Sequence, residues 1–191
     1  MPLITTLAGG SARGYGGLFG AIPIADSAFE SIQTYTASGT VGDITFNSIP
    51  SNYKILQFRM MLRTVDSGGG DRSLFAQFNG DTASNYYYNR IYSYPSFLGQ
   101  DNANASGVYA GIFLNDGNPT GCYGGNIFEI VDYANTNKTK QSRQIGGSTE
   151  SQFFSASYWT GTAAINSVRF FPSGGTSFKV NSTIALYGIK G

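Results

Sequence analysis

The sequence contains no histidine and a single cysteine, Cys122, and only 12% of its 191 residues are charged. Without histidine it lacks the usual base of serine and cysteine hydrolases, and it has no Cys/His cluster that could hold zinc. One cysteine cannot form an internal disulfide, so we expect Cys122 to be a small buried residue, with a reactive thiol as the alternative. No metal ion or other cofactor is expected.

The sequence also lacks an excess of either charge and any long apolar run. Its 12 Lys and Arg residues are scattered and give a net charge of +1, so we expect no nucleic-acid partner. No apolar stretch approaches the roughly 20 residues of a membrane span, so no membrane insertion is expected. The start, MPLITTLAGG, lacks the basic and apolar regions of a secretion signal, which predicts synthesis in a cytoplasm.

What the sequence has instead is 26 glycines, 13 tyrosines and 14 phenylalanines, a composition that favours strands and turns over helices. Between residues 53 and 65, Leu56, Phe58, Met60 and Leu62 alternate with polar side chains. A similar alternation near the end places Phe178, Val180, Ile184 and Leu186 on one face. Further strands are predicted at Ser31–Ala37, Asp43–Ile49, Ser73–Asn79, Tyr86–Tyr92, Val108–Leu114, Asn126–Tyr133, Gln141–Gly146, Phe153–Tyr158 and Ile165–Phe171. The pattern predicts an all-β fold, an antiparallel jelly-roll-like β-sandwich, with one short helix considered at Asp26–Ile32.

The first 25 residues differ from the rest and predict a separate extended arm, with the sandwich domain covering residues 26–191. Ser11–Ala25 (SARGYGGLFGAIPIA) is rich in glycine and has neither helical nor strand periodicity. It is nevertheless too apolar for a solvated tail. Its apolar members are Tyr15, Leu18, Phe19, Ile22 and Ile24. They indicate either an attachment arm that lies along a partner or a leader that lies on its own domain.

The longest stretch without a predicted strand, Ser93–Ser106, is the first candidate for a binding loop, because loops carry contacts on a rigid sandwich. The candidate contacts with a host-surface glycan are Tyr94, Phe97, Gln100, Asp101, Asn102 and Asn104. The alternative is a loop packed against a neighbouring subunit. Just before it, Asn79-Gly80 predicts a turn, and Tyr86 and Tyr88 should face one way with Tyr87 the other. Trp159 is expected in the core or in an interface.

A pair of carboxylates could still cleave glycosides, and Asp101, Asp116, Glu129 and Asp132 are the candidates. Asp101 and Asp116 occur in Asn- and Gly-rich segments, where aspartate is favoured because it bonds its own backbone. We therefore expect a protein that is not an enzyme.

Five segments resemble a type of bacteriophage virion protein: Phe29–Ile32 (FESI), Phe46–Thr64, Ser73–Tyr86 (with FNGDT), Asp132–Lys140 (DYANTNKTK) and Ala185–Gly191 (ALYGIKG). The resemblance implies a structural protein of the virion, a tail-fibre or tail-associated module that contacts the host surface. A capsid decoration protein is the alternative, and a glycan-cleaving enzyme is a third.

The low charge and the abundance of Tyr, Phe and Gly suit self-complementary interfaces, so a homotrimer is expected. Other virion proteins would be contacted through the N-terminal arm.

Overall fold

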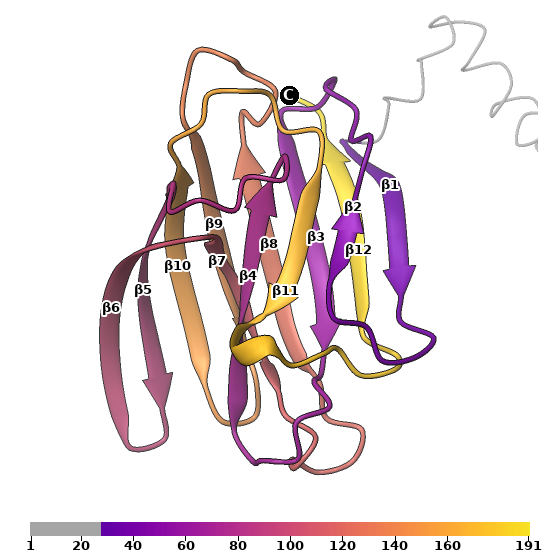
Figure 1. Cartoon of the computed structure of the whole chain (residues 1–191), viewed down its shortest axis with the longest axis vertical. Helices are drawn as coiled ribbons and strands as arrows, with labels where there is room; N and C mark the ends of the chain where they lie inside the picture. Colours follow the sequence, from indigo (N-terminus) through magenta and orange to yellow (C-terminus); the bar gives the residue numbers. More distant parts are fainter. Residues whose placement is uncertain (1–27) are drawn as a thin grey trace, which may run out of the picture.

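The computed structural model describes residues 28–191, which contain twelve β-strands and one short 3-10 turn (Figure 1). The all-β prediction is confirmed, and the proposed arm of residues 1–25 lies outside the described residues. The strands are β1 (Phe29–Thr36), β2 (Ile44–Phe46), β3 (Ile55–Leu62), β4 (Asp71–Phe78), β5 (Tyr86–Tyr94), β6 (Phe97–Ala105), β7 (Val108–Leu114), β8 (Gly124–Val131), β9 (Lys140–Gly147), β10 (Gln152–Trp159), β11 (Val168–Pro172) and β12 (Thr183–Ile189).

The strands form two packed sheets whose order is that of a jelly roll. One sheet has eight strands in the order β1-β12-β3-β8-β9-β10-β5-β6, and the other has four in the order β2-β11-β4-β7. If β5, β6, β9 and β10 are set aside, the remaining strands divide into two interleaved four-stranded sheets, β1-β12-β3-β8 and β2-β11-β4-β7. This is the double Greek key of a jelly roll, so the predicted sandwich type is confirmed.

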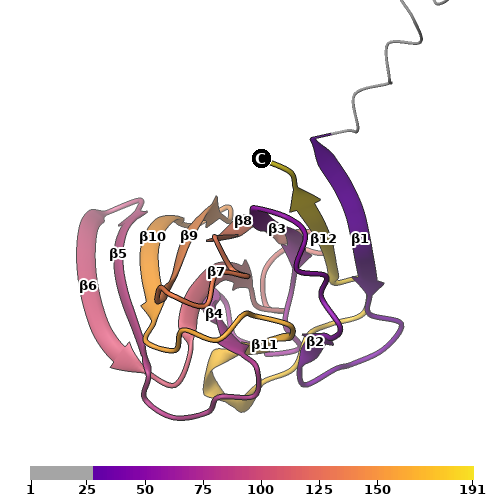
Figure 2. The same cartoon turned by 90° about the horizontal axis from the view of Figure 1, so that it is seen from above.

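Two inserted hairpins lengthen one of the sheets. The β5–β6 hairpin lies in the connection from β4 to β7, and the β9–β10 hairpin lies in the connection from β8 to β11. They join through antiparallel pairing of β10 with β5, without a shift in register. Figure 2 shows the result, a long sheet that runs from β6 to β1 and extends beyond the four-stranded sheet on the β6 side.

An aromatic cluster joins the two sheets at the centre of the core. Phe58 and Phe128 come from the long sheet, Phe46 and Phe170 come from the short one, and all four are fully buried. The ring centroids of Phe58 and Phe170 lie 4.9 Å apart in an edge-to-face contact. Edge-to-face pairs of this kind add to the stabilisation from burial alone.

The turn at Asn79-Gly80 and the tyrosine run behind it are confirmed as predicted. Asn79 and Gly80 both have positive φ, 52° and 74°, and the side chain of Asn79 donates to the carbonyl of Ala164. Tyr86 points into the core, where its hydroxyl donates to the backbone oxygen of Asp81 at 2.8 Å, and Tyr87 points to the opposite face. Trp159 is buried and donates to the Asp81 carboxylate at 2.7 Å, so it belongs to the core.

Near the two ends of the domain the strands differ from the sequence pattern. Of Asp26–Ile32, the segment considered for a short helix, the described residues from Phe29 onward form the start of β1, because pairing with β12 imposes an extended backbone there. The last strand begins only at Thr183, since Asn181 has positive φ and turns the chain. Within residues 28–191 no helix is long and apolar enough to cross a membrane.

The segment DYANTNKTK is held in shape by a buried lysine. Lys140 is 1% exposed, and its ammonium donates to the carbonyl oxygens of Lys138 at 2.9 Å and Thr162 at 2.8 Å, and also to that of Asn135. A buried charge is tolerated only when such partners surround it. This part of the sequence resemblance therefore has a structural role.

Replacing Lys140 by methionine should destabilise the domain by about 2–4 kcal/mol, because three carbonyl oxygens would lose a buried donor. Lys138→Met is the matched control, since Lys138 is exposed and pairs with Asp132 only at the surface, and it should cost less than about 1 kcal/mol. Urea unfolding measures both. Equal effects would show that the buried contacts of Lys140 do not stabilise the loop.

Candidate functional site

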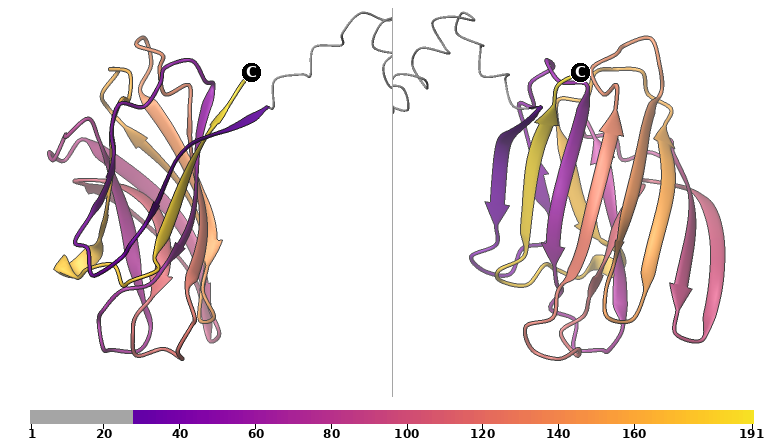
Figure 3. Two further views of the ribbon diagram at one scale, coloured as in Figure 1. Left: turned by 90° about the vertical axis from the view of Figure 1, so that its right-hand side faces the viewer. Right: turned by 180° about the vertical axis from the view of Figure 1, so that it is seen from behind.

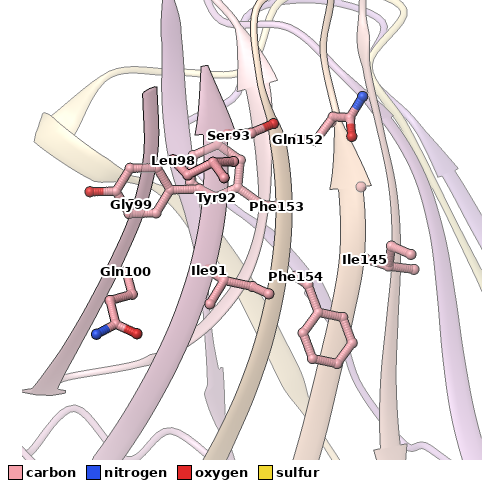
Figure 4. A pocket seen from close by; sticks show the side chains of 12 residues that line it. Ile91, Tyr92, Ser93, Leu98, Gly99, Gln100, Ile145, Gln152, Phe153 and Phe154 are labelled. Carbon is pink, nitrogen blue, oxygen red and sulfur yellow. The ribbon is translucent and has the colours of Figure 1, made fainter. Parts of the chain in front are cut away.

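The outer face of the long sheet carries a row of apolar side chains that the sandwich leaves uncovered. Strand register places Ile127 of β8 opposite Ile145 of β9, Ile145 opposite Phe154 of β10, and Phe154 opposite Ile91 of β5. Figure 4 shows Ile91, Phe154 and Ile145 side by side on their strands. Leu98 of β6 flanks this row at one end. All of these side chains are solvent-exposed.

We call this surface the apolar band and define it as Met61, Ile91, Leu98, Ile127, Ile145 and Phe154. Leu98 is 85% exposed and Ile145 59%, both unusually high for large aliphatic side chains. The right-hand view of Figure 3 looks onto the sheet face that carries the band. Contiguous exposed apolar surface of this kind makes the band the candidate interaction surface of the domain.

Glycines hollow out the surface beside the band. Gly125 of β8 lies opposite Gly147 of β9, so these two neighbouring positions on adjacent strands carry no side chain. A shallow hollow of about 790 Å³ extends from Ile91 and Leu98 to Ile145 and Gly147. A second hollow, of about 460 Å³, continues past Ile145 to Ile127 and Met61. The two hollows share Ile145 and Gly146, so they flank the band on both sides of Ile145.

Charged groups on the same face are hydrogen-bonded to neighbouring side chains. Glu129 accepts from Arg143 at 2.5 Å and from Gln57 at 2.6 Å, and Gln57 in turn accepts from Arg59 at 2.7 Å. The Arg59 guanidinium also lies 4.8 Å from the ring centre of Tyr187. This row of hydrogen-bonded side chains crosses β3, β8 and β9 next to the band. The polar groups beside the band therefore already have hydrogen-bond partners.

The segment Ser93–Ser106 is not the irregular loop that the sequence predicted. It consists of the end of β5, a two-residue turn at Pro95-Ser96, and β6, which pairs with β5 from Phe97 to Ala105. Its Asn, Gly and Ala residues have low strand propensity, so no local signal marked a strand. Pairing along the whole of β5 provides the hydrogen bonds that impose the extended backbone.

Because successive residues of a strand face opposite sides, β6 divides the candidate glycan contacts between two faces. Gln100, Asn102 and Asn104 point outward with Leu98, and Asn104 donates to the hydroxyl of Tyr87 at 3.3 Å. The Tyr87 ring stacks on Tyr158 with centroids 4.9 Å apart. Asp101 faces inward, and Phe97 pairs with Tyr94 where the hairpin closes.

On the inner face, Asp101 forms an ion pair with Arg90 surrounded by aromatic rings. The guanidinium donates to both carboxylate oxygens, at 2.5 and 2.6 Å. Its central carbon lies 4.7 Å from the ring centre of Tyr109 and 5.5 Å from that of Tyr92. Burial lowers the pKa of the Arg90 guanidinium, but the Asp101 carboxylate together with Tyr109 and Tyr88 more than offsets burial, so the pKa lies above its ordinary value. The ion pair between Asp101 and Arg90 therefore stabilises the β5–β6 hairpin.

Tyr94 also lies on this inner side. Its hydroxyl donates to Asp71 at 3.1 Å. Burial and the negative charge of Asp71 raise the pKa of Tyr94 to about 12. A hollow of about 300 Å³ between the hairpin and β4 is lined by Tyr94, Asp71, Arg72 and Arg90 among others. Of the five candidate contacts whose side chains the structure describes, it thus gathers Gln100, Asn102 and Asn104 on the open outer face and leaves Tyr94 and Asp101 on the inner face.

The four carboxylates considered for glycoside cleavage each lie beside a cation. Asp101 pairs with Arg90, Glu129 with Arg143, Asp132 with Lys138, and Asp116 with both Lys179 and Arg63. Lys179 and Arg63 hold the pKa of Asp116 below its ordinary value. A general acid needs the opposite shift.

Cys122, expected to be buried, is half-buried, and its backbone oxygen accepts from the buried Arg63 at 2.8 Å. Among residues 28–191 there is no group of three His, Cys, Asp or Glu side chains placed to hold a metal ion.

Neither the family models nor the curated proteins include a match to this chain. Among solved structures, Scytalido-glutamic peptidase with a peptide-based transition-state analogue aligns with a TM-score of 0.27 and 10% identity, over 82% of this chain and 66% of that one. A protein of unknown function from Shewanella oneidensis MR-1 aligns with a TM-score of 0.26 and 9% identity, over 85% of this chain and 76% of that one. Likenesses this distant carry no argument about activity, so the function is argued from the surfaces described above.

Asp101→Asn should destabilise the domain by about 1–3 kcal/mol, because it leaves the largely buried Arg90 without its countercharge. Asp43→Asn is the matched control: it also removes the partner of an arginine that lies over a ring, but both members of the Asp43–Arg169 pair are exposed. The control should cost less than about 1 kcal/mol. Chemical unfolding compares the two. An Asp101 variant as stable as its control would show that Asp101 does not stabilise the hairpin.

Proposed function

We propose that this chain is a structural protein of a bacteriophage virion, a tail-fibre or tail-associated module that contacts the host surface. The apolar band carries the proposal, because a sheet face with exposed Ile, Leu, Met and Phe side chains is suited to burial against another protein. The virion itself is inferred from the sequence resemblance in FNGDT, DYANTNKTK and ALYGIKG. A capsid decoration protein of the same fold is the second candidate.

The fold and the pairing of charged groups support a structural role. Jelly rolls serve as viral capsid and lectin domains, although an argument from fold alone is an analogy. The paired carboxylates favour assembly over glycan cleavage, since each candidate acid has a cation beside it. Two of the five segments that resemble virion proteins contain residues that shape the fold: Asn79 and Asp81 shape a turn, and Lys140 holds a loop.

The test is to locate the chain in purified particles of the phage that encodes it. Antibodies raised against the domain should label particles in electron microscopy, and gel densitometry should give the copy number. Labelling of the tail with a few or dozens of copies supports the fibre, whereas labelling of the capsid with hundreds supports the decoration protein. Absence of the chain from washed particles would contradict both.

The contribution of the band is measured in the same particles. Ile145→Thr together with Phe154→Thr should leave stability within about 1 kcal/mol, because both side chains are exposed. It should lower incorporation into particles at least several-fold. Arg143→Thr with Gln141→Thr, on the same face of β9 as Ile145, is the control and should incorporate normally. Equal incorporation of both double variants would exclude the band as the assembly surface.

Deleting residues 1–24 should leave a folded domain, because the two sheets and the described core are built from residues 28–191. If the segment is the attachment arm, the shortened chain should no longer join the particle. Circular dichroism and thermal unfolding check the fold, and particle incorporation checks the attachment. Loss of folding on deletion would show instead that the segment belongs to the domain.

A further inference from the structure

Among the strands of residues 28–191, β6 is an edge of the long sheet, and the backbone groups on its unpaired side can be identified from the hairpin. Tyr94 and Phe97 close a two-residue turn, and the closing pair of such a hairpin exchanges hydrogen bonds. Bonded and non-bonded pairs then alternate along the strands. It follows that the N–H and C=O groups of Leu98, Gln100, Asn102 and Asn104 point away from β5, toward the open edge.

The other three sheet edges in the described domain are blunted, whereas β6 is not. Strand β1 has a register shift between Ser31 and Gln33, β2 is only three residues long, and every residue of β7 is buried. Strand β6 has nine residues, pairs with β5 without a bulge, and contains no lysine, arginine or proline. Proteins normally protect a long edge strand with such features, because an unprotected edge pairs with another chain.

We propose that two copies of this chain pair antiparallel through β6, so that their long sheets become one continuous sheet. A second copy is favoured as the occupant because the edge is self-complementary. Its outward side chains are Leu98 and the amides Gln100, Asn102 and Asn104, which carry no charge to repel the same strand, and each amide both donates and accepts. The one acidic residue of β6, Asp101, points inward and is neutralised by Arg90.

A two-fold axis beside Asp101 gives a complete register. Gln100 of one copy then lies opposite Asn102 of the other, and Leu98 lies opposite Asn104. Each of these residues has its N–H and C=O directed at the edge, so each opposed pair exchanges two backbone hydrogen bonds. An interface of this isologous kind closes with two copies, in place of the trimer expected from composition. It would also bring the two apolar bands onto one continuous face.

The experiment measures molar mass by light scattering after size exclusion, at 1 to 100 µM of the full chain. The wild type should approach twice the chain mass of 20.4 kDa. Asn102→Pro removes an edge N–H, a change tolerated on edge strands, and Asn102→Lys places like charges across the two-fold axis. Each should raise the dimer dissociation constant at least tenfold while leaving the circular dichroism spectrum unchanged.

Asn89→Lys is the matched control. Asn89 is the direct partner of Asn102 on β5, so the same charge appears on the same face one strand further in. This variant should remain dimeric. The pairing would be overturned if the wild type were a monomer at 100 µM or a trimer. It would also be overturned if both Asn102 variants stayed dimeric, or if Asn89→Lys weakened the dimer as much as they do. These measurements are made on the purified chain in solution, so their outcome does not depend on where the chain lies in a virion.

Discussion

The pairing of β10 with β5 is the contact on which the rest of the molecule depends. It runs from Gln152 opposite Ser93 to Trp159 opposite Tyr86 without a register shift, and it joins two hairpins that belong to different connections of the jelly roll. An isolated two-stranded hairpin is marginally stable in water. Joined to β10, the β5–β6 hairpin becomes part of the long sheet, which then extends beyond the four-stranded sheet.

This extension explains the unusual features of the domain. Its inner face has no full partner sheet. Strand β7 of the four-stranded sheet reaches it, and Tyr109 and Ile112 of β7 pack there with Phe153 of β10 and flanking tyrosines. Arg90 enters that cluster because Asp101 on the next strand neutralises it. Within residues 28–191 nothing covers its outer face, where Ile91, Leu98, Ile145 and Phe154 of the apolar band lie. The free edge of β6 is the third consequence of the same extension.

The low charge of the sequence is matched by the way its few cations are used. Arg63 is 3% exposed and donates to four backbone oxygens between Asp116 and Cys122, which fixes that loop. Lys140 does the same for the loop before β9. Both residues look like ordinary surface cations in the sequence, because nothing in their neighbours indicates burial. Their role depends on carbonyl groups that the fold brings from elsewhere.

Alternation of apolar and polar residues was enough to predict most strands and the sandwich. The Asn-Gly pair predicted the turn at Asn79-Gly80, and the two-residue period of a strand predicted the opposed directions of Tyr86 and Tyr87. These features depend on a residue and its near neighbours, which the sequence displays directly. Strand β6 was missed because its Asn, Gly and Ala residues have no strand preference, and its pairing with β5 decided its conformation. That pairing also separated Asp101 from Gln100 and Asn102, which adjacent sequence positions had suggested would act together.

The amino-acid sequence by itself therefore determined the fold class, the parity of each regular strand and the scarcity of catalytic groups. Only the tertiary structure decided which strands became neighbours, which face of the long sheet stayed uncovered and which edge remained open. The reason is that the row of Ile127, Ile145, Phe154 and Ile91 exists only across strands. Cross-strand neighbours are set by long-range pairing and register, and a local sequence pattern specifies neither.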